Sequence, residues 1–299
     1  MPIQSVDARM QRIFVSLLLA PLLSLVAAAQ EIGTLTLLKD GPLHVIRGFS
    51  VLEGVEGMRI RQGDIFETGP AETAQAQLEF AGGTVVELGP SSRVFLSRQQ
   101  GATGELILQS GWLKGETASG VYRYATPLIA VTTKGGNVLV HAAAETADVF
   151  VERGSASVGI GRAGAVASST SKMFFTRHPG KPVAAAPRPS PEFIRGMPVP
   201  FRDVLPPRWS RFAGKKAPEP KHDHDVSYAE VERWLTLSPG WRRSFVERFK
   251  PRLQDSSFRQ SIEDHLAALP EWGPILHPEK YPTEPAPTDK SVPPGRYLR

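Results

Sequence analysis

The sequence predicts an all-β domain, a sandwich or roll of short strands, followed by a proline-rich linker and a small α-helical segment. Three observations support this. Apolar residues alternate with polar ones over residues 74–80, placing Ala74, Ala76, Leu78 and Phe80 on one face, which is the period of a strand with one buried face. Turn signals recur every eight to twelve residues or so, the spacing typical of sandwiches and barrels. Finally, 20 of the 27 prolines follow residue 180.

Charge divides the chain in the same place. Residues 30–180 carry 13 basic and 14 acidic side chains, whereas residues 181–299 carry 20 basic and 15 acidic ones. A neutral, glycine-punctuated half is therefore followed by a basic, proline-rich half. The predicted segments are a leader at 1–29, a β-domain at 30–180, a linker at 181–226, a helical segment at 227–273 and a disordered tail at 274–299.

The N-terminal residues have the pattern of a secretory signal peptide. Arg9 and Arg12 precede an apolar run at 13–26, and the small residues of 27–29 fit a cleavage site that leaves Gln30 first in the mature chain. The alternative is an uncleaved anchor, although residues 13–29 number only 17, which is short for a membrane span, and Pro21 interrupts them. We therefore expect an exported, periplasmic protein without stable membrane insertion after cleavage.

Short strands are predicted from residue 33 to residue 176. In the 74–80 hairpin strand, Gln75, Gln77 and Glu79 are expected to face water, and Gly82-Gly83 is expected to form the turn. Ser110-Gly111 is interpreted as a further turn. The predicted strands are 33–38, 43–47, 58–61, 65–68, 74–80, 84–88, 94–97, 105–109, 112–116, 123–125, 128–133, 138–142, 149–152, 156–160 and 173–176.

A set of turn residues recurs in an order that resembles a known family. These landmarks are Gly63, Asp64, Thr68, Gly69, Gly83, Thr84, Pro90, Ser92, Gly111, Thr126, Pro127, Gly136 and Gly154. Over about residues 33–165 the chain resembles the FecR-type domain of bacterial envelope proteins, although Gly82 and Gly136-Asn137 depart from the family pattern. The resemblance implies a periplasmic all-β module that mediates protein contacts. Founding members link an outer-membrane receptor to a cytoplasmic sigma factor, but the residues before the apolar run are too few for a sigma-binding domain.

No catalytic or cofactor motif stands out, and neither an enzyme nor a cofactor is expected. The chain has no cysteine, which excludes thiol catalysis and disulfides. The glycine string at 159–164 precedes small β-forming residues, so a strand-end turn explains it better than a dinucleotide site. The His222–Asp225 segment carries metal-ligating residue types, but a flexible stretch without further ligands would bind weakly.

Three aromatic residues near predicted turns are candidate ligand contacts. Trp112, Tyr122 and Tyr124 suit a platform for stacking sugars, while packing between strands is the commoner use of such residues. No nucleic-acid partner is expected of an exported chain.

The basic half is predicted to contain three helices after an extended linker. Ser227 and Ser238 are N-cap candidates for the first two helices, and Asp255 or Ser256 begins the third, which Pro270 ends. So short a helical segment would gain stability by docking on another surface. Six cations on it are candidate contacts for anionic lipid or glycan phosphate, although a solvated face also explains them: Arg242, Arg243, Arg248, Lys250, Arg252 and Arg259.

These observations favour a non-enzymatic binding or scaffolding module that makes protein contacts in the bacterial cell envelope. Envelope signalling is one role that such a module could have. Exposed strand edges and turns would bind the partner, with the helical tail as a second contact surface. The alternative is a cell-wall glycan binder that uses Trp112 and the two tyrosines.

Overall fold

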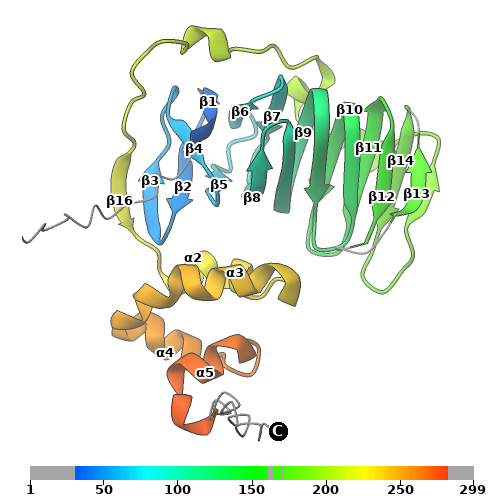
Figure 1. Ribbon diagram of the computed structural model, residues 1–299. Coiled ribbons are helices and arrows are strands. Elements are labelled where there is room, and N and C mark those ends of the chain that lie inside the picture. The colour runs from blue at the N-terminus through cyan, green and yellow to red at the C-terminus, as the bar shows by residue number, and fades with distance from the viewer. Residues whose placement is uncertain (1–30, 161–164, 170, 282–299) are drawn as a thin grey trace, which may run out of the picture.

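The structure is a computed structural model that describes residues 31–160, 165–169 and 171–281. The predicted leader, residues 282–299 of the predicted tail and most of the glycine string lie outside the described residues. One antiparallel sheet curls around an apolar core, and short helices lie against one side of it (Figure 1). Within the described ranges, no helix is long and apolar enough to cross a membrane. The predicted all-β class with short C-terminal helices is confirmed.

The sheet runs in the order β15-β14-β11-β10-β9-β8-β5-β2-β3-β16, with the remaining strands attached to its sides. All its pairings are antiparallel. The strands are β1 (Glu31–Lys39), β2 (Leu43–Arg47), β3 (Ser50–Glu53), β4 (Arg59–Arg61), β5 (Ile65–Thr68), β6 (Gln75–Phe80), β7 (Thr84–Leu88), β8 (Arg93–Gln100), β9 (Thr103–Ala125), β10 (Ala130–Ala142), β11 (Ala147–Arg153), β12 (Ala156–Gly159), β13 (Ala165–Ser169), β14 (Met173–Arg177), β15 (Ala184–Ala186) and β16 (Lys221–Asp225).

Two long strands replace five predicted short ones. β9 continues through Gly111, and β10 continues through Gly136, so neither glycine is the predicted turn between strands. Both have positive φ angles, 90° and 101°; Gly136 lies at an irregularity of the β9–β10 pairing, and Gly111 follows an irregularity of the β8–β9 pairing by two residues. They let a strand bulge without ending it. Because β9 pairs with β7, β8 and β10, it curls the sheet on itself.

Alanine at Gly136 is expected to lower the free energy of unfolding by about 3 kcal/mol. A Cβ there would lie 2.2 Å from the carbonyl oxygen of Arg153, in a backbone conformation that side chains rarely adopt. Gly63 is a matched control, since its φ is also positive (84°) but no atom lies within 4 Å of the added Cβ. Gly63→Ala should therefore cost only about 1 kcal/mol. Urea unfolding of both variants measures the difference, and equal losses would contradict the assigned close approach.

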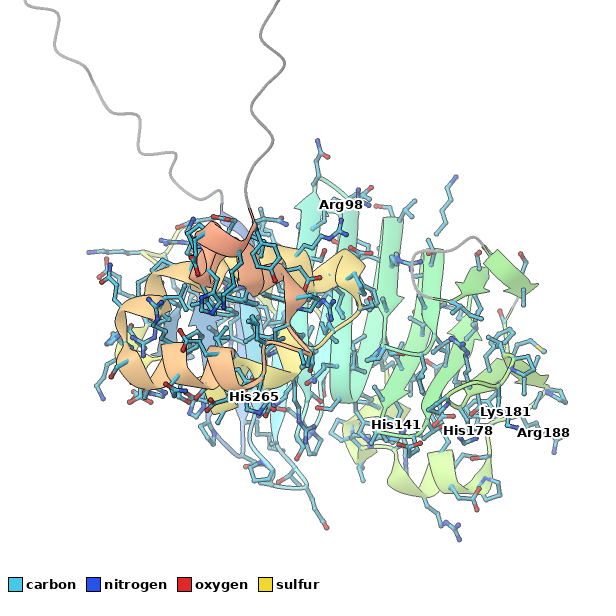
Figure 2. All side chains as sticks on the ribbon, turned by 90° about the horizontal axis from the view of Figure 1, so that it is seen from below. Arg98, His141, His178, Lys181, Arg188 and His265 are labelled. Carbon is cyan, nitrogen blue, oxygen red and sulfur yellow. The ribbon has the colours of Figure 1, made fainter. Side chains whose placement is uncertain are left out.

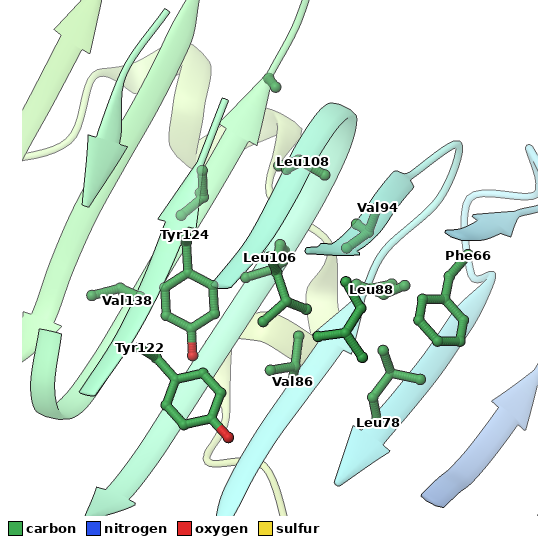
Figure 3. Close-up of a cluster of buried hydrophobic side chains, with 14 of the residues drawn as sticks. Phe66, Leu78, Val86, Leu88, Val94, Leu106, Leu108, Tyr122, Tyr124 and Val138 are labelled. Atoms are coloured by element: carbon green, nitrogen blue, oxygen red, sulfur yellow. The ribbon is translucent and has the colours of Figure 1, made fainter. Parts of the chain in front are cut away.

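The main core lies inside the curl of the sheet. Its side chains come from opposite walls, including Phe66, Leu78, Leu106 and Val138, all with no exposed surface (Figure 3). The alternation predicted for residues 74–80 supplies Ala76, Leu78 and Phe80 to this core. The predicted inward face is therefore correct.

A second core joins the helical segment to the outside of the sheet. Ile65, Phe95 and Ile107 of the sheet pack with Trp234 and Phe245, whose rings contact Phe95. The helices are α2 (Tyr228–Leu235), α3 (Pro239–Phe249), α4 (Ser256–Asp264) and α5 (Gly273–Leu276), with single 3₁₀ turns at 250–254, 270–272 and 278–280. The helical segment is thus docked on its own β-domain.

Local capping residues start the helices where the sequence predicts. Ser227 and Glu230 form a capping box at α2, and the Asp255 carboxylate accepts hydrogen bonds from the backbone N–H groups of Ser257 and Phe258 at α4. Ser238 precedes α3 but makes no side-chain cap. The third helix ends at Asp264, before the expected Pro270, and Leu276 of the predicted disordered tail is buried in the second core. Apolar burial therefore orders the first residues of the predicted tail.

The predicted linker is part of the folded domain. Its two strands extend the sheet at opposite ends: β15 pairs with β14, and β16 pairs with β3. Between them, α1 (Pro191–Gly196) and 3₁₀ turns at 199–202 and 209–211 replace the expected extended conformation. Figure 1 shows this segment crossing the side of the sheet away from α2–α5. Residues 188–216 are called the strap below.

Candidate functional site

An open sheet edge and an adjacent groove form the candidate site. β15 is the last strand of the sheet and has β14 as its single partner among the described residues. Its alanines carry no charge, and Ala184 and Ala185 are exposed. His178, Lys181 and Arg188 lie exposed around it (Figure 2). The edge can therefore pair with an added strand, and the positive charges of Lys181 and Arg188 favour an acidic one.

The groove lies on the sheet face beside β15, beneath α1. It has a volume of about 470 Å³. Its floor is aromatic, because Trp112 stacks on His141 at 4.2 Å between ring centroids and packs against Phe193 at 5.0 Å. The Asp148 carboxylate lies 3.3 Å from Nδ1 of His141, and Thr176 also lines the wall. This space, the Trp112 groove, can receive one apolar or amphipathic side chain of a bound segment.

Local sequence builds the roof of the groove. The hydroxyl of Ser190 accepts a hydrogen bond from the backbone N–H of Phe193, and Pro191 occupies the first helical turn of α1. Phe193 is then buried against Trp112 and Phe174. Sequence reasoning missed α1, although Ser190-Pro191 is a helix-start signal of the kind used for α3.

The strap is fixed to the sheet through its backbone. The ammonium of Lys114 donates hydrogen bonds to the carbonyl oxygens of Phe201 (2.9 Å) and Asp203 (2.6 Å). The Glu116 carboxylate accepts one from the N–H of Leu205 (3.0 Å). Phe201 and Leu205 are themselves buried. Charged sheet residues thus hold the strap in one path.

The same pattern continues along β6 and corrects the expected wet face. The Glu79 carboxylate accepts hydrogen bonds from the backbone N–H groups of Arg208 (2.6 Å) and Trp209 (3.1 Å), and the Gln77 amide donates one to the carbonyl oxygen of Pro206. Gln75, Gln77 and Glu79 are buried, not solvated. Gln77 and Glu79 hydrogen-bond the backbone of the strap, which covers this face in place of water.

Beneath the strap, a carboxyl group and an ammonium group are neighbours across β7 and β9. Glu87 and Lys114 are 3% and 1% exposed. Burial raises the pKa of the Glu87 carboxyl to about 7, although the cations of Lys114 and Arg208 oppose this change. Lys114 also lies 3.3–3.4 Å from the carboxylates of Glu116 and Glu152. This network has a structural role in holding the strap.

The predicted aromatic platform does not form. Tyr122 and Tyr124 have no exposed surface, and their rings lie 6.2 Å apart inside the main core. They cannot stack on a ligand, because the alternation of β9 turns both inward. Trp112 is 9% exposed and lines the groove described above. It is the one member of the predicted trio beside a cavity.

The family landmarks before β8 shape turns and backbone contacts. Asp64 is buried, and its carboxylate accepts two hydrogen bonds from Arg47 and one from the backbone N–H of Arg61. Gly63 is the neighbouring turn residue. The Thr68 hydroxyl donates to the carbonyl oxygen of Gly89, and the N–H of Gly69 donates to that of Pro42.

The remaining landmarks have similar structural positions. Gly83 closes the β6–β7 hairpin with a φ of 73°, and Thr84 begins β7. The Thr126 hydroxyl accepts hydrogen bonds from the backbone N–H groups of residues 128 and 129, around Pro127 in the turn between β9 and β10. Gly154 has a φ of 91° between β11 and β12. These residues support the architecture and do not converge on the Trp112 groove.

Most candidate cations of the helices are engaged inside the molecule. The Arg248 guanidinium donates to the carbonyl oxygens of Ile46, Gly48 and Gly63, and burial lowers its pKa to about 10. Arg242, Arg252 and Arg259 pair with Glu271, Asp255 and Glu263. A free cationic surface is therefore not formed by this set.

The histidine-rich segment at 222–225 belongs to β16, where His224 Nε2 lies 2.7 Å from the Glu230 carboxylate. In the described part of the chain, no group of three metal-ligating side chains comes together. The segment thus forms an edge strand and is not the expected flexible stretch.

Comparisons with known proteins give partial likenesses. No family model matches the sequence, and no curated protein matches it. Two crystal structures of a "putative anti-sigma factor" from Parabacteroides distasonis ATCC 8503, at 2.50 and 1.65 Å resolution, each share 14% identity and a TM-score of 0.36 with this chain. The matches cover 42% and 41% of this chain and 60% and 59% of those chains, so this chain spans about three fifths of their length.

Proposed function

We propose that this protein is a non-enzymatic binding and scaffolding module of the bacterial cell envelope. It binds a partner protein by strand addition at β15, with one partner side chain in the Trp112 groove. The observation that carries this proposal is the open, uncharged edge beside an aromatic pocket. In strand addition, backbone hydrogen bonds supply affinity and pockets for alternate side chains supply specificity.

The sequence supports the setting of this function. The predicted signal peptide favours the periplasm, and the resemblance to FecR-type domains favours a module that makes protein contacts, with envelope signalling as one role. The three-residue length of β15 suits a docking edge that resists self-association. The Trp112 groove and the cations around β15 would then determine which partner protein binds.

Proline substitution tests the edge directly. Successive residues of an antiparallel strand direct their backbone groups to opposite sides, so one of Ala184→Pro and Ala185→Pro removes an outward N–H group. We expect that variant to lose at least tenfold in crosslinked partner recovered from intact envelopes, with an unchanged melting temperature. Asp223→Pro, on the edge strand β16 at the other end of the sheet, is the matched control and should retain capture.

Thr176→Tyr narrows the groove and tests its part in binding. We expect it to weaken the same capture. Undiminished capture by both proline variants would contradict strand addition. Recovery of glycan-linked material alone, lost in Thr176→Tyr and kept in both proline variants, would instead favour the second candidate function. That function is glycan binding, for which an aromatic floor with a polar rim is also suitable.

A further inference from the structure

The outer side of the strap is unusually apolar for a surface. Four side chains project from it with 47–70% of their surface exposed: Ile194, Val199, Val204 and Trp209. They account for four of the seven exposed large hydrophobic residues in the described part of the chain. Single exposed apolar residues are ordinary, but four of them between residues 194 and 209 of one segment, called the apolar row below, mark a candidate contact surface.

The strap presents this row on a rigid support. Phe193, Phe201 and Leu205 anchor its inner side in the sheet, and backbone bonds to Lys114, Glu116 and Glu79 hold its path. A surface that is already ordered loses little conformational freedom on binding. The row is therefore available without rearrangement.

Positive charge accompanies the apolar row. The strap carries seven basic and two acidic residues, a net charge of five that equals the +5 of the entire chain. Arg202, Lys215 and Lys216 are exposed, and in the described ranges no carboxylate lies within the 4.0 Å of an ion pair from any of them. Arg195 and Arg211 are also exposed, with single partners in Glu192 and Glu56. Of the six helical cations considered above, by contrast, four have partners within the molecule.

We propose that the outer side of the strap docks on the surface of an anionic phospholipid bilayer. Charge complementarity selects this occupant, because Lys and Arg side chains are attracted to the negative surface potential of an anionic leaflet. The exposed Val, Ile and Trp side chains are suited to the boundary between headgroups and acyl chains, where indole rings concentrate. The strap lies across the sheet from α2–α5, so these helices leave it free to meet a flat surface (Figure 1). A bilayer contact here leaves the β15 edge to a protein partner.

Vesicle sedimentation tests this proposal with the chain from residue 30 onward. The probes are phosphatidylcholine vesicles with and without phosphatidylglycerol. We expect binding to the anionic vesicles, little binding to the neutral ones, and weakening by salt. The triple variants Arg202→Gln/Lys215→Gln/Lys216→Gln and Val199→Ser/Val204→Ser/Trp209→Ser should each reduce the bound fraction at least tenfold at limiting lipid. All six side chains are exposed, so both variants should keep the parent's melting temperature.

The matched control removes the same charge from the other side of the molecule. Arg233→Gln/Arg243→Gln/Lys250→Gln alters three exposed cations of the helical segment, and it should bind vesicles like the parent. Three results would overturn the proposal: no preference for anionic vesicles, full binding by both strap variants, or equal loss in the control, which would show attraction by net charge alone. Partner capture at β15 is measured separately, so either proposal can fail without the other.

Discussion

Arg248→Ala is expected to lower the free energy of unfolding by about 3 kcal/mol. The guanidinium of Arg248 ties α3 to the sheet through the carbonyl oxygens of Ile46 and Gly48, both at 2.6 Å, and of Gly63. The side chain remains charged at neutral pH, because burial lowers its pKa only to about 10. Its removal leaves three carbonyl groups without their charged donor where the helix covers the sheet. Urea unfolding followed by tryptophan fluorescence measures the loss.

The neighbouring residue Arg243 provides the control. It is exposed on the same helix without an ion pair to any described residue, so Arg243→Ala should change the stability by no more than about 0.5 kcal/mol. Hydrogen exchange should also quicken in α2–α4 of Arg248→Ala before it quickens in the sheet. Equal stability of the two variants would mean that the apolar contacts of Trp234 and Phe245 with Phe95 dock the helices alone.

Glu87→Gln is expected to stabilise the protein at high pH and to leave its stability nearly unchanged at low pH. The pKa of the Glu87 carboxyl is about 7 in the folded protein, against an ordinary value of 4.5. Between these values the folded chain keeps a proton that the unfolded chain has released, so rising pH favours unfolding. The contribution of Glu87 is fully present below the lower value and is lost as pH rises through 7. The shift corresponds to about 3 kcal/mol.

Urea unfolding of parent and variant at about pH 4, 6 and 8 measures this difference. The gain from Glu87→Gln should grow from near zero at the lowest pH to about 3 kcal/mol at the highest. Glu72→Gln is the control, because that carboxylate is exposed, and its effect should stay small throughout. A gain at Glu87 that does not vary with pH would contradict the raised pKa, and a loss at high pH would show that Lys114 keeps the carboxylate charged and stabilising.

Elements whose determinants are close in the chain were predictable from the sequence. The capping residues Ser227 and Asp255 act within one helical turn, and the Gly82-Gly83 turn joins adjacent strands. The inward face of residues 74–80 was also predictable, since strand alternation alone assigns the two sides. What alternation leaves open is the occupant of the opposite side. A glutamate on the polar face of a strand is usually solvated. The Glu79 carboxylate instead accepts hydrogen bonds from backbone N–H groups 129 and 130 residues later in the chain.

The candidate site depends mostly on contacts of this long-range kind. Trp112 was identified from the sequence, but its neighbours His141 and Phe193 come from β10 and α1, and no local pattern associates them. Tyr122 and Tyr124 were indistinguishable from Trp112 in residue type. They differ because the curl of the sheet encloses their side of β9. The open edge at β15 was likewise unpredictable, since three alanines resemble any part of a linker.

The β class, the helix starts and the change of composition at residue 180 follow from local patterns, because alternation, capping and composition act over a few residues. Long-range packing sets three further features: the path of the proline-rich segment as a strap, the burial of the polar face of β6, and the position of β15 at the edge of the sheet. Hydrogen bonds and burial between residues far apart in the chain make those choices. Contacts between residues far apart in the chain produce no periodic pattern in a single sequence.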